Sequence, residues 1–211
     1  MSQIETQRFI SYWQSLVPQG QVPRPEHGYM SDDGLSALSY KTPLRKDYDP
    51  LSLKDMVPDM FMITTWRDDY RLRLNGANIT HWHNAELQAF IFSDLFEPHS
   101  QAGVRSALSL SEVREKPVIL SLRAKLETYD YIQLSIVLAP LCNRNQLTDR
   151  FIGFYNVDDE AYKVTKLSKQ PFKLLNTRLI EGEITPMSER HKPKLNQPQL
   201  RLITLNGQRL A

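Results

Sequence analysis

Two histidines that flank a tryptophan, His81-Trp82-His83, are the residues of this sequence whose types and spacing best suit chemistry. Imidazoles at positions i and i+2 lie on one side of a strand, where they can share a metal ion, whereas on a helix they point well apart. The nearest further histidine is His99. Three interpretations stay open: polar residues beside a packed Trp82, a metal site that includes His99, or one axial histidine for a haem iron. We place the pair on a short helix and predict no metal site.

Motifs for covalent catalysis or phosphate transfer are missing from the sequence. It contains no G-x-S-x-G, no phosphate-binding glycine loop and no H-E-x-x-H. The single cysteine, Cys142, stands beside Asn143 and Arg144. A neighbouring cation lowers the pKa of a thiol, but we interpret Cys142 as an inert small residue. We therefore predict that the chain is not an enzyme.

The composition is that of an ordinary globular protein. The 211 residues include 26 basic and 24 acidic side chains, so the net charge is +2. This balance argues against nucleic-acid binding, although several basic residues near the C-terminus keep that alternative open. The single cysteine permits no internal disulfide, and we find neither a secretory signal nor an apolar segment of membrane-spanning length. We expect a cytoplasmic location and no membrane contact.

Alternating apolar and polar residues predict the strands that must position these side chains. Residues 60–65 form an apolar run, and Tyr70, Leu72 and Leu74 then alternate with Arg71 and Arg73. Further strands are predicted at residues 118–127, 131–138 and 151–157, with turns short enough for antiparallel pairing. Arg71 and Arg73 share one face of their strand, either as a solvated surface or as an interface with a partner.

Helical spacing predicts the remaining elements. Phe9, Trp13 and Leu16 fall on one face of an N-terminal amphipathic helix, and we propose them as interface residues. Short helices are expected between residues 77 and 98, and a longer helix between 100 and 115. The resulting fold class is α+β, one sheet with helices packed on one face. We divide the chain into an N-terminal helix and Pro-rich wrap (1–50), a central domain (51–160) and a partly irregular C-terminal extension (161–211).

Four short motifs follow one another in the central part of the chain. They are the run KDYDPLSLKDMVPDMFMI from Lys46, the run YRLRLNGANI from Tyr70, the strand end Leu138-Ala139-Pro140-Leu141 and the strand start Phe151-Ile152-Gly153. Over residues 8–157 the chain thereby resembles the PAS domain family, and in particular the short stand-alone PAS proteins of alphaproteobacteria. That subfamily usually carries F-G-R-D-L-T-G after the second motif. Here residues 80–87 stand in its place, without the glycines and with two histidines.

The resemblance implies a five-stranded antiparallel sheet that cradles short helices, and a role in signal sensing or protein docking. Because no kinase, cyclase or DNA-binding pattern follows residue 157, we expect the signal to pass to a partner protein, with a homodimer as the expected assembly. The alternatives are a haem- or metal-binding protein that uses His81 and His83, or a ligand-free adaptor. The residues that we expect around a small-molecule ligand are Asn78, His81, Trp82, His83, Phe92 and Tyr155.

Overall fold

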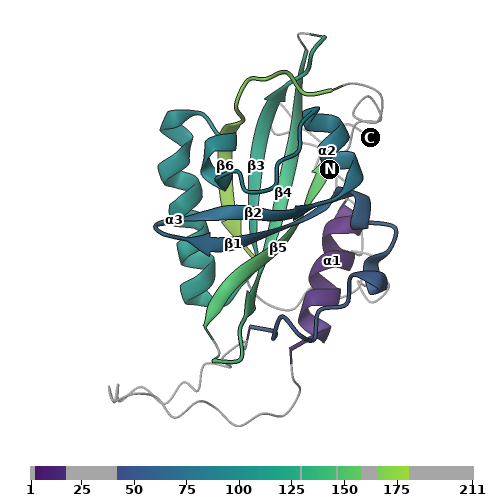
Figure 1. Ribbon diagram of the computed structural model, residues 1–211, viewed down its shortest axis with the longest axis vertical. Coiled ribbons are helices and arrows are strands. Elements are labelled where there is room, and N and C mark those ends of the chain that lie inside the picture. The colour runs from purple at the N-terminus through teal and green to yellow at the C-terminus, as the bar shows by residue number, and fades with distance from the viewer. Residues whose placement is uncertain (1–2, 18–41, 129, 146, 158–165, 181–211) are drawn as a thin grey trace, which may run out of the picture.

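An antiparallel six-stranded sheet forms the centre of the protein, in the order β2-β1-β5-β4-β3-β6 (Figure 1). The computed structural model describes residues 3–17, 42–157 except 129 and 146, and 166–180. Helices pack on the sheet, so the predicted α+β class is confirmed. The predicted wrap between residues 18 and 41, and the basic segment between 181 and 211, lie outside the described residues.

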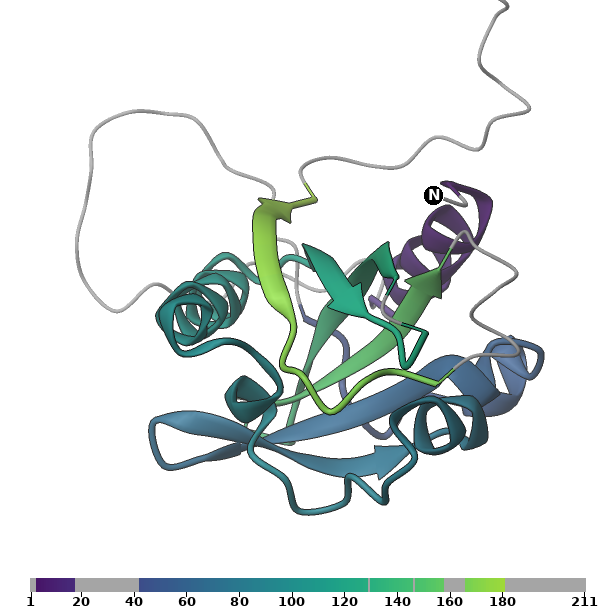
Figure 2. The ribbon, with the colours of Figure 1, turned by 90° about the horizontal axis from the view of Figure 1, so that it is seen from above.

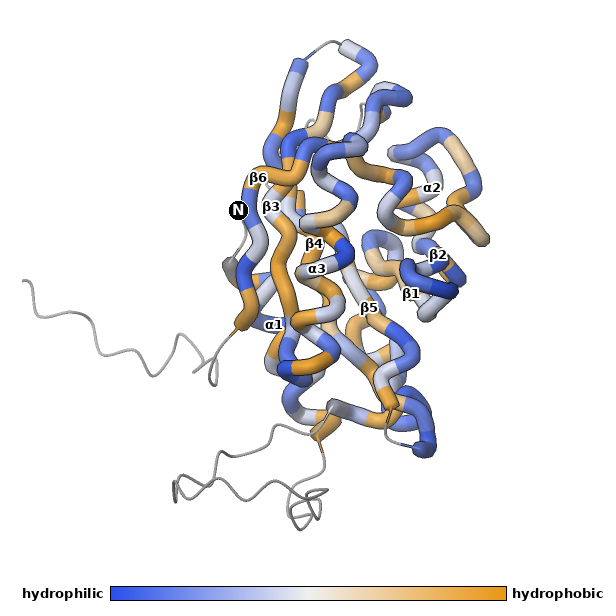
Figure 3. The backbone as a smooth tube through the Cα atoms, turned by 90° about the vertical axis from the view of Figure 1, so that its left-hand side faces the viewer, coloured by the Kyte–Doolittle hydropathy of each residue, from blue (hydrophilic) through white to orange (hydrophobic). Residues whose placement is uncertain are grey.

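The elements follow the chain in an order close to the predicted one. They are α1 (Gln3–Ser15), the 3-10 helices η1 (Pro50–Leu53) and η2 (Val57–Asp59), β1 (Met60–Trp66), β2 (Asp69–Asn75), α2 (Ala77–His83), η3 (Phe92–Leu95), α3 (Pro98–Arg114), β3 (Val118–Lys125), β4 (Tyr131–Cys142), β5 (Thr148–Val157) and β6 (Lys173–Leu179). Hydrophobic colour concentrates along the central strands in Figure 3.

β6 is an addition to the five predicted strands. It pairs antiparallel with β3, from Val118 opposite Leu179 to Arg123 opposite Lys173. Four of its seven residues are exposed, and they include the apolar Leu175. The segment therefore lacks the in–out alternation from which a strand is predicted. It becomes a strand because the edge of β3 offers unpaired backbone groups, a tertiary effect that local sequence does not carry.

The inner face of the sheet is covered by α2, η3 and α3, and the outer face by α1. Figure 2 shows α1 and α3 on opposite sides of the sheet. Each side has its own apolar core. The helix α2 sits close to η2 because it starts at Gly76: a Cβ atom there would lie 2.2 Å from the Pro58 carbonyl oxygen. Only a residue without a side chain permits that approach.

The outer core corrects one prediction. Phe9 and Trp13 are buried within the protomer, and Leu16 is partly buried, so the first two do not form an exposed interface. The Trp13 indole donates a hydrogen bond to the Pro140 carbonyl at 2.8 Å, and the ring centroids of Phe9 and Phe154 lie 5.0 Å apart. A helix this short is marginal alone in water, so its apolar stripe is stabilised by packing on its own sheet.

Candidate functional site

An interlocked group of aromatic rings fills the space between the inner face of the sheet and the helices. The rings come from β1, α2, η3, β5 and the segments that follow η3 and precede β6. Neighbouring centroids lie between 5.4 and 6.5 Å apart, mostly edge to face. Such geometry is favourable for aromatic pairs. We call this group the aromatic cluster: Phe61, Trp82, His83, Phe92, Phe96, Tyr155 and Phe172.

A hydrogen-bonded pair lies within the aromatic cluster. The Nε2 atom of His83 and the hydroxyl oxygen of Tyr155 are 3.1 Å apart. Burial lowers the pKa of His83 to about 4, because a charged imidazole is poorly solvated there. Burial also raises the pKa of the Tyr155 phenol. Both side chains are therefore neutral near pH 7, and they form a polar contact within apolar surroundings.

The structure brings together four of the six predicted pocket residues. Trp82, His83, Phe92 and Tyr155 belong to the aromatic cluster. Asn78 and His81 are exposed instead, because α2 is a helix and directs them away from the sheet. Asn78 donates a hydrogen bond to Asp59 at 3.0 Å. We correct their assignment to the pocket.

Sequence reasoning missed three members of the cluster, Phe61, Phe96 and Phe172. Phe61 lies in the apolar run at the start of β1, and such a run is typical of a buried strand, so its burial could have been predicted. Phe172 stands between Pro171 and Lys173, and its surroundings show no clear alternation that would mark it as a core residue. Its burial follows from the pairing of β6 with the sheet.

The segment of residues 166–172 holds the helices over the aromatic cluster. Its backbone N–H groups at Leu167 and Phe172 donate to the carbonyls of Trp82 and Leu95, each at 2.8 Å. The Phe172 carbonyl accepts a hydrogen bond from the Glu97 N–H at 2.9 Å. This short segment thus joins α2 to η3 and closes the interior.

A haem ligated by Nε2 of His83 would have to displace the Tyr155 hydroxyl and the rings beside the imidazole. An axial histidine needs a free ring nitrogen and a flat apolar slot beside it. Nε2 of His83 already contacts Tyr155, and the Phe172 ring lies 5.6 Å from the imidazole. His81 is exposed, and His99 lies at the start of α3 with its Nε2 3.0 Å from Glu97. No group of three or more His, Cys, Asp or Glu able to hold a metal occurs within the described residues.

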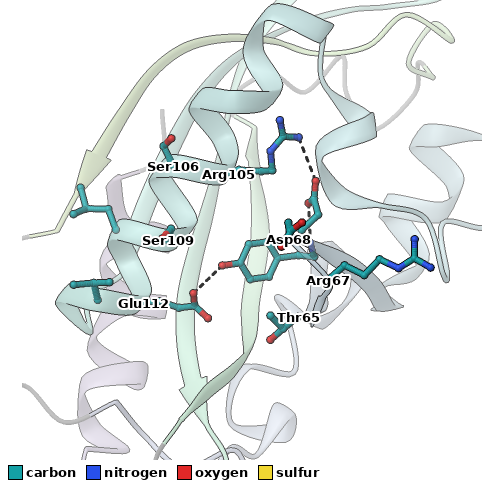
Figure 4. A pocket seen from close by; sticks show the side chains of 11 residues that line it. Thr65, Arg67, Asp68, Arg105, Ser106, Ser109 and Glu112 are labelled. Carbon is teal, nitrogen blue, oxygen red and sulfur yellow. Dashed lines mark hydrogen bonds and ion pairs between the residues drawn. The ribbon is translucent and has the colours of Figure 1, made fainter.

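A hollow opens between the β1–β2 turn and α3 (Figure 4). Its volume is about 620 Å³. Tyr70 donates a hydrogen bond to Glu112 at 3.0 Å across it, and Arg105 forms an ion pair with Asp69 at 3.4 Å. Burial raises the pKa of Glu112, although the bond from Tyr70 opposes that shift. The lining is Thr65, Arg67, Asp68, Asp69, Tyr70, Arg105, Ser106, Ser109, Leu110, Glu112 and Val113.

The two predicted interface arginines lie on β2. Arg71 is partly buried and stacks on the Trp66 ring, with its guanidinium carbon 3.5 Å from the ring centroid. Arg73 is exposed. The contact of Arg71 is a cation–π interaction within the chain. Arg73 therefore remains the more accessible of the two for a partner.

The fold and the packed interior define a class of protein: α+β domains whose antiparallel sheet carries short helices between its second and third strands. Within that class, the chain belongs to the PAS domain family, because the family model matches residues 34–156. β6 and the closing segment of residues 166–172 lie beyond this match. No curated protein matches the chain.

Solved PAS-type structures resemble this chain at low sequence identity. The light-state structure of the blue-light photoreceptor Aureochrome1 LOV has 10% identity and a TM-score of 0.40, covering 53% of this chain and 90% of that chain. The Rhodobacter sphaeroides LOV protein has 13% identity and a TM-score of 0.41, covering 54% and 70%. An RNA-binding light-oxygen-voltage receptor has 15% identity and a TM-score of 0.42, covering 66% and 38%. None of the helices in the described part of the chain has the length and apolar character that crossing a bilayer requires.

Proposed function

We propose that this chain is a PAS-type signalling module that acts through a partner protein and keeps its interior closed by its own side chains. The packed aromatic cluster is the observation that supports this proposal. The Tyr155 ring contacts four other rings of the cluster, those of Phe61, Trp82, His83 and Phe172. A large prosthetic group would have to displace several of these rings, and displacing them would expose apolar surface. The ligand-free adaptor is therefore the form that we favour.

The finer parts of the proposal rest on the sequence. The resemblance to short stand-alone PAS proteins of alphaproteobacteria supports a module whose signal leaves through another protein. The lack of nucleophile and phosphate-loop motifs supports a non-enzymatic role. The buried thiol of Cys142 is consistent with the cytoplasm. We also propose a homodimer, although Phe9 and Trp13 do not supply its surface.

A small-molecule sensor is the second candidate, and the His83–Tyr155 pair favours it. Ligand sites in proteins are mostly apolar with a few placed polar groups, and this pair is such a polar point. A ligand would enter by rearrangement of the segment of residues 166–172. In that case the aromatic cluster would be the closed state of a sensor.

Native mass spectrometry of the purified chain separates these candidates. The adaptor predicts masses of the 24.5 kDa chain, or twice that mass for the homodimer, without an adduct. The variant Tyr155→Trp enlarges a ring inside the cluster and should exclude a ligand. A stoichiometric adduct that is present in the parent and absent in this variant would favour the sensor and contradict the adaptor. Light scattering measures the dimer independently, and a monomer at all concentrations would refute that part of the proposal.

A further inference from the structure

A pocket lined by four cations lies at the end of the sheet where β4 turns into β5. Its volume is about 490 Å³, and its cationic side chains are Arg45, Lys46, Arg144 and Arg150. Leu44, Cys142 and Asn143 complete the lining. This pocket is separate from the aromatic cluster and from the hollow beside α3, because the three share no residue.

The backbone fixes the two chain segments that supply these cations. Leu44 forms a parallel bridge with Cys142, and the Arg45 N–H donates to the Cys142 carbonyl at 2.9 Å. On the other side, the Asn143 side chain accepts hydrogen bonds from the N–H groups of Asn145 and Leu147, at 2.8 and 3.2 Å. These bonds order the turn that carries Arg144. The cations are thus held together by the fold, although about a hundred residues of sequence separate the segments.

The positive charge of the pocket is only partly balanced. Asp149 forms an ion pair with Arg45 at 3.1 Å. Among the described residues, the Nε–H of Arg150 and the Oδ1 atom of Asp149 are both buried without a hydrogen-bond partner. Burial, and then the charges of Arg45 and Arg73, lower the pKa of Arg150, although the charge of Asp149 opposes that shift. An anion in the pocket would relieve this repulsion and supply acceptors to the guanidinium groups.

The distribution of charge indicates the size of the anion. The whole chain carries a net charge of only +2, which is far from the basic excess of a nucleic-acid binder. The cations gather instead around one concave space, whose volume lies within the range of small-molecule sites, about 300–1,000 Å³. Guanidinium groups match the geometry of phosphate oxygens particularly well.

We propose that this pocket binds a compact phosphate-bearing anion, which is held by Arg45, Arg144 and Arg150. Such an anion would join the segment of residues 42–46 to the β4–β5 turn. The inference does not depend on the function proposed above, because the pocket lies outside the interior. It adds a polar ligand site to a module whose interior is apolar.

Titration calorimetry of the full chain with inorganic pyrophosphate tests the proposal. We expect saturable binding that weakens as ionic strength rises from about 0.02 to about 0.15 M, since partly exposed charges are screened. Arg144→Gln should weaken binding by about tenfold, because one charge-assisted contact is lost. Arg45→Gln provides a second variant with the same expectation. Both side chains are exposed, so these substitutions are compatible with folding, which circular dichroism verifies.

Arg114→Gln is the matched control. Arg114 is exposed at the end of α3, so this substitution removes one positive charge at a place away from the pocket. Binding that is unchanged in Arg144→Gln and Arg45→Gln overturns the proposal. Equal weakening in the control also overturns it, because the effect would then follow net charge. The proposal is also overturned if a glutamate-rich peptide binds and pyrophosphate does not. That result would assign the pocket to an acidic protein partner. If chloride competes with pyrophosphate at equal concentration, the binding is nonspecific electrostatic attraction, and the proposed site is refuted.

Discussion

The pH dependence of stability should report directly on His83. Its pKa is about 4 in the folded protein against an ordinary value of 6.5, and burial is the cause. Between these two values the unfolded chain binds a proton that the folded protein excludes. Stability contributed by the neutral imidazole is therefore fully present above about pH 6.5 and is lost as the pH falls toward 4. From pH 7 to pH 5 the two pKa values correspond to a loss of about 2 kcal/mol.

The variant His83→Gln isolates this contribution. Glutamine retains an amide that can bond to Tyr155 but does not titrate. Urea unfolding followed by tryptophan fluorescence at pH 7 and pH 5 gives the free energy of unfolding for both proteins. Carboxylates contribute equally to both, so the difference between their pH dependences belongs to His83. Between pH 7 and pH 5, we expect the free energy of unfolding of the variant to fall by about 2 kcal/mol less than that of the parent.

The variant His81→Gln is the control, because it lies on the same helix with an exposed side chain. We expect it to keep the pH dependence of the parent. If the curves of His83→Gln and the parent run parallel between pH 7 and pH 5, His83 is not held neutral by burial. The aromatic cluster would then be more open to water than its ring contacts indicate.

Three further substitutions, two of them with a matched control, test the packing by urea unfolding at pH 7. Trp13→Ala should cost about 3–5 kcal/mol, because it leaves a large cavity between α1 and the sheet, whereas Ile4→Ala on the same helix, 70% exposed, should cost little. Gly153→Ala should cost about 1–3 kcal/mol, because the new methyl group would lie 2.6 Å from a ring carbon on β1. Gly103→Ala, where the nearest atom is a flexible side-chain end 3.1 Å away, should be neutral or stabilising. Phe172→Ala should cost about 3 kcal/mol and increase amide exchange in β6; protection unchanged from the parent would contradict its role as an anchor.

Most of the fold was predictable because burial imposes a period on the sequence. The strands β2 and β3 alternate between apolar and polar residues, and the longer helix α3 has apolar residues at helical spacing. The helix starts at Pro98, two residues before the predicted start, because proline fits the first turn of a helix. The arrangement of strands also followed from short turns, which favour antiparallel neighbours.

The candidate sites were less predictable because they depend on contacts between distant segments. Trp82 and Tyr155 were found through the resemblance, which places α2 and β5 beside the interior. The fit of α1 to the outer face was missed, since an apolar stripe indicates burial but does not name the surface that buries it. The cationic pocket was missed for a similar reason: Arg45 and Arg150 become neighbours only when residues 42–46 pair with the end of β4.

The closure of the interior depends on a part of the chain that the family pattern does not include. The PAS match ends at residue 156, whereas the Phe172 ring and the segment of residues 166–172 complete the aromatic cluster. β6, which continues this segment, is an edge strand with four exposed residues, and such strands open more readily than central ones. Opening of β6 would withdraw Phe172 and break the hydrogen bonds to α2 and η3. We therefore expect amide protection in β6 and the packing of Phe172 to be lost together when the sheet edge is destabilised.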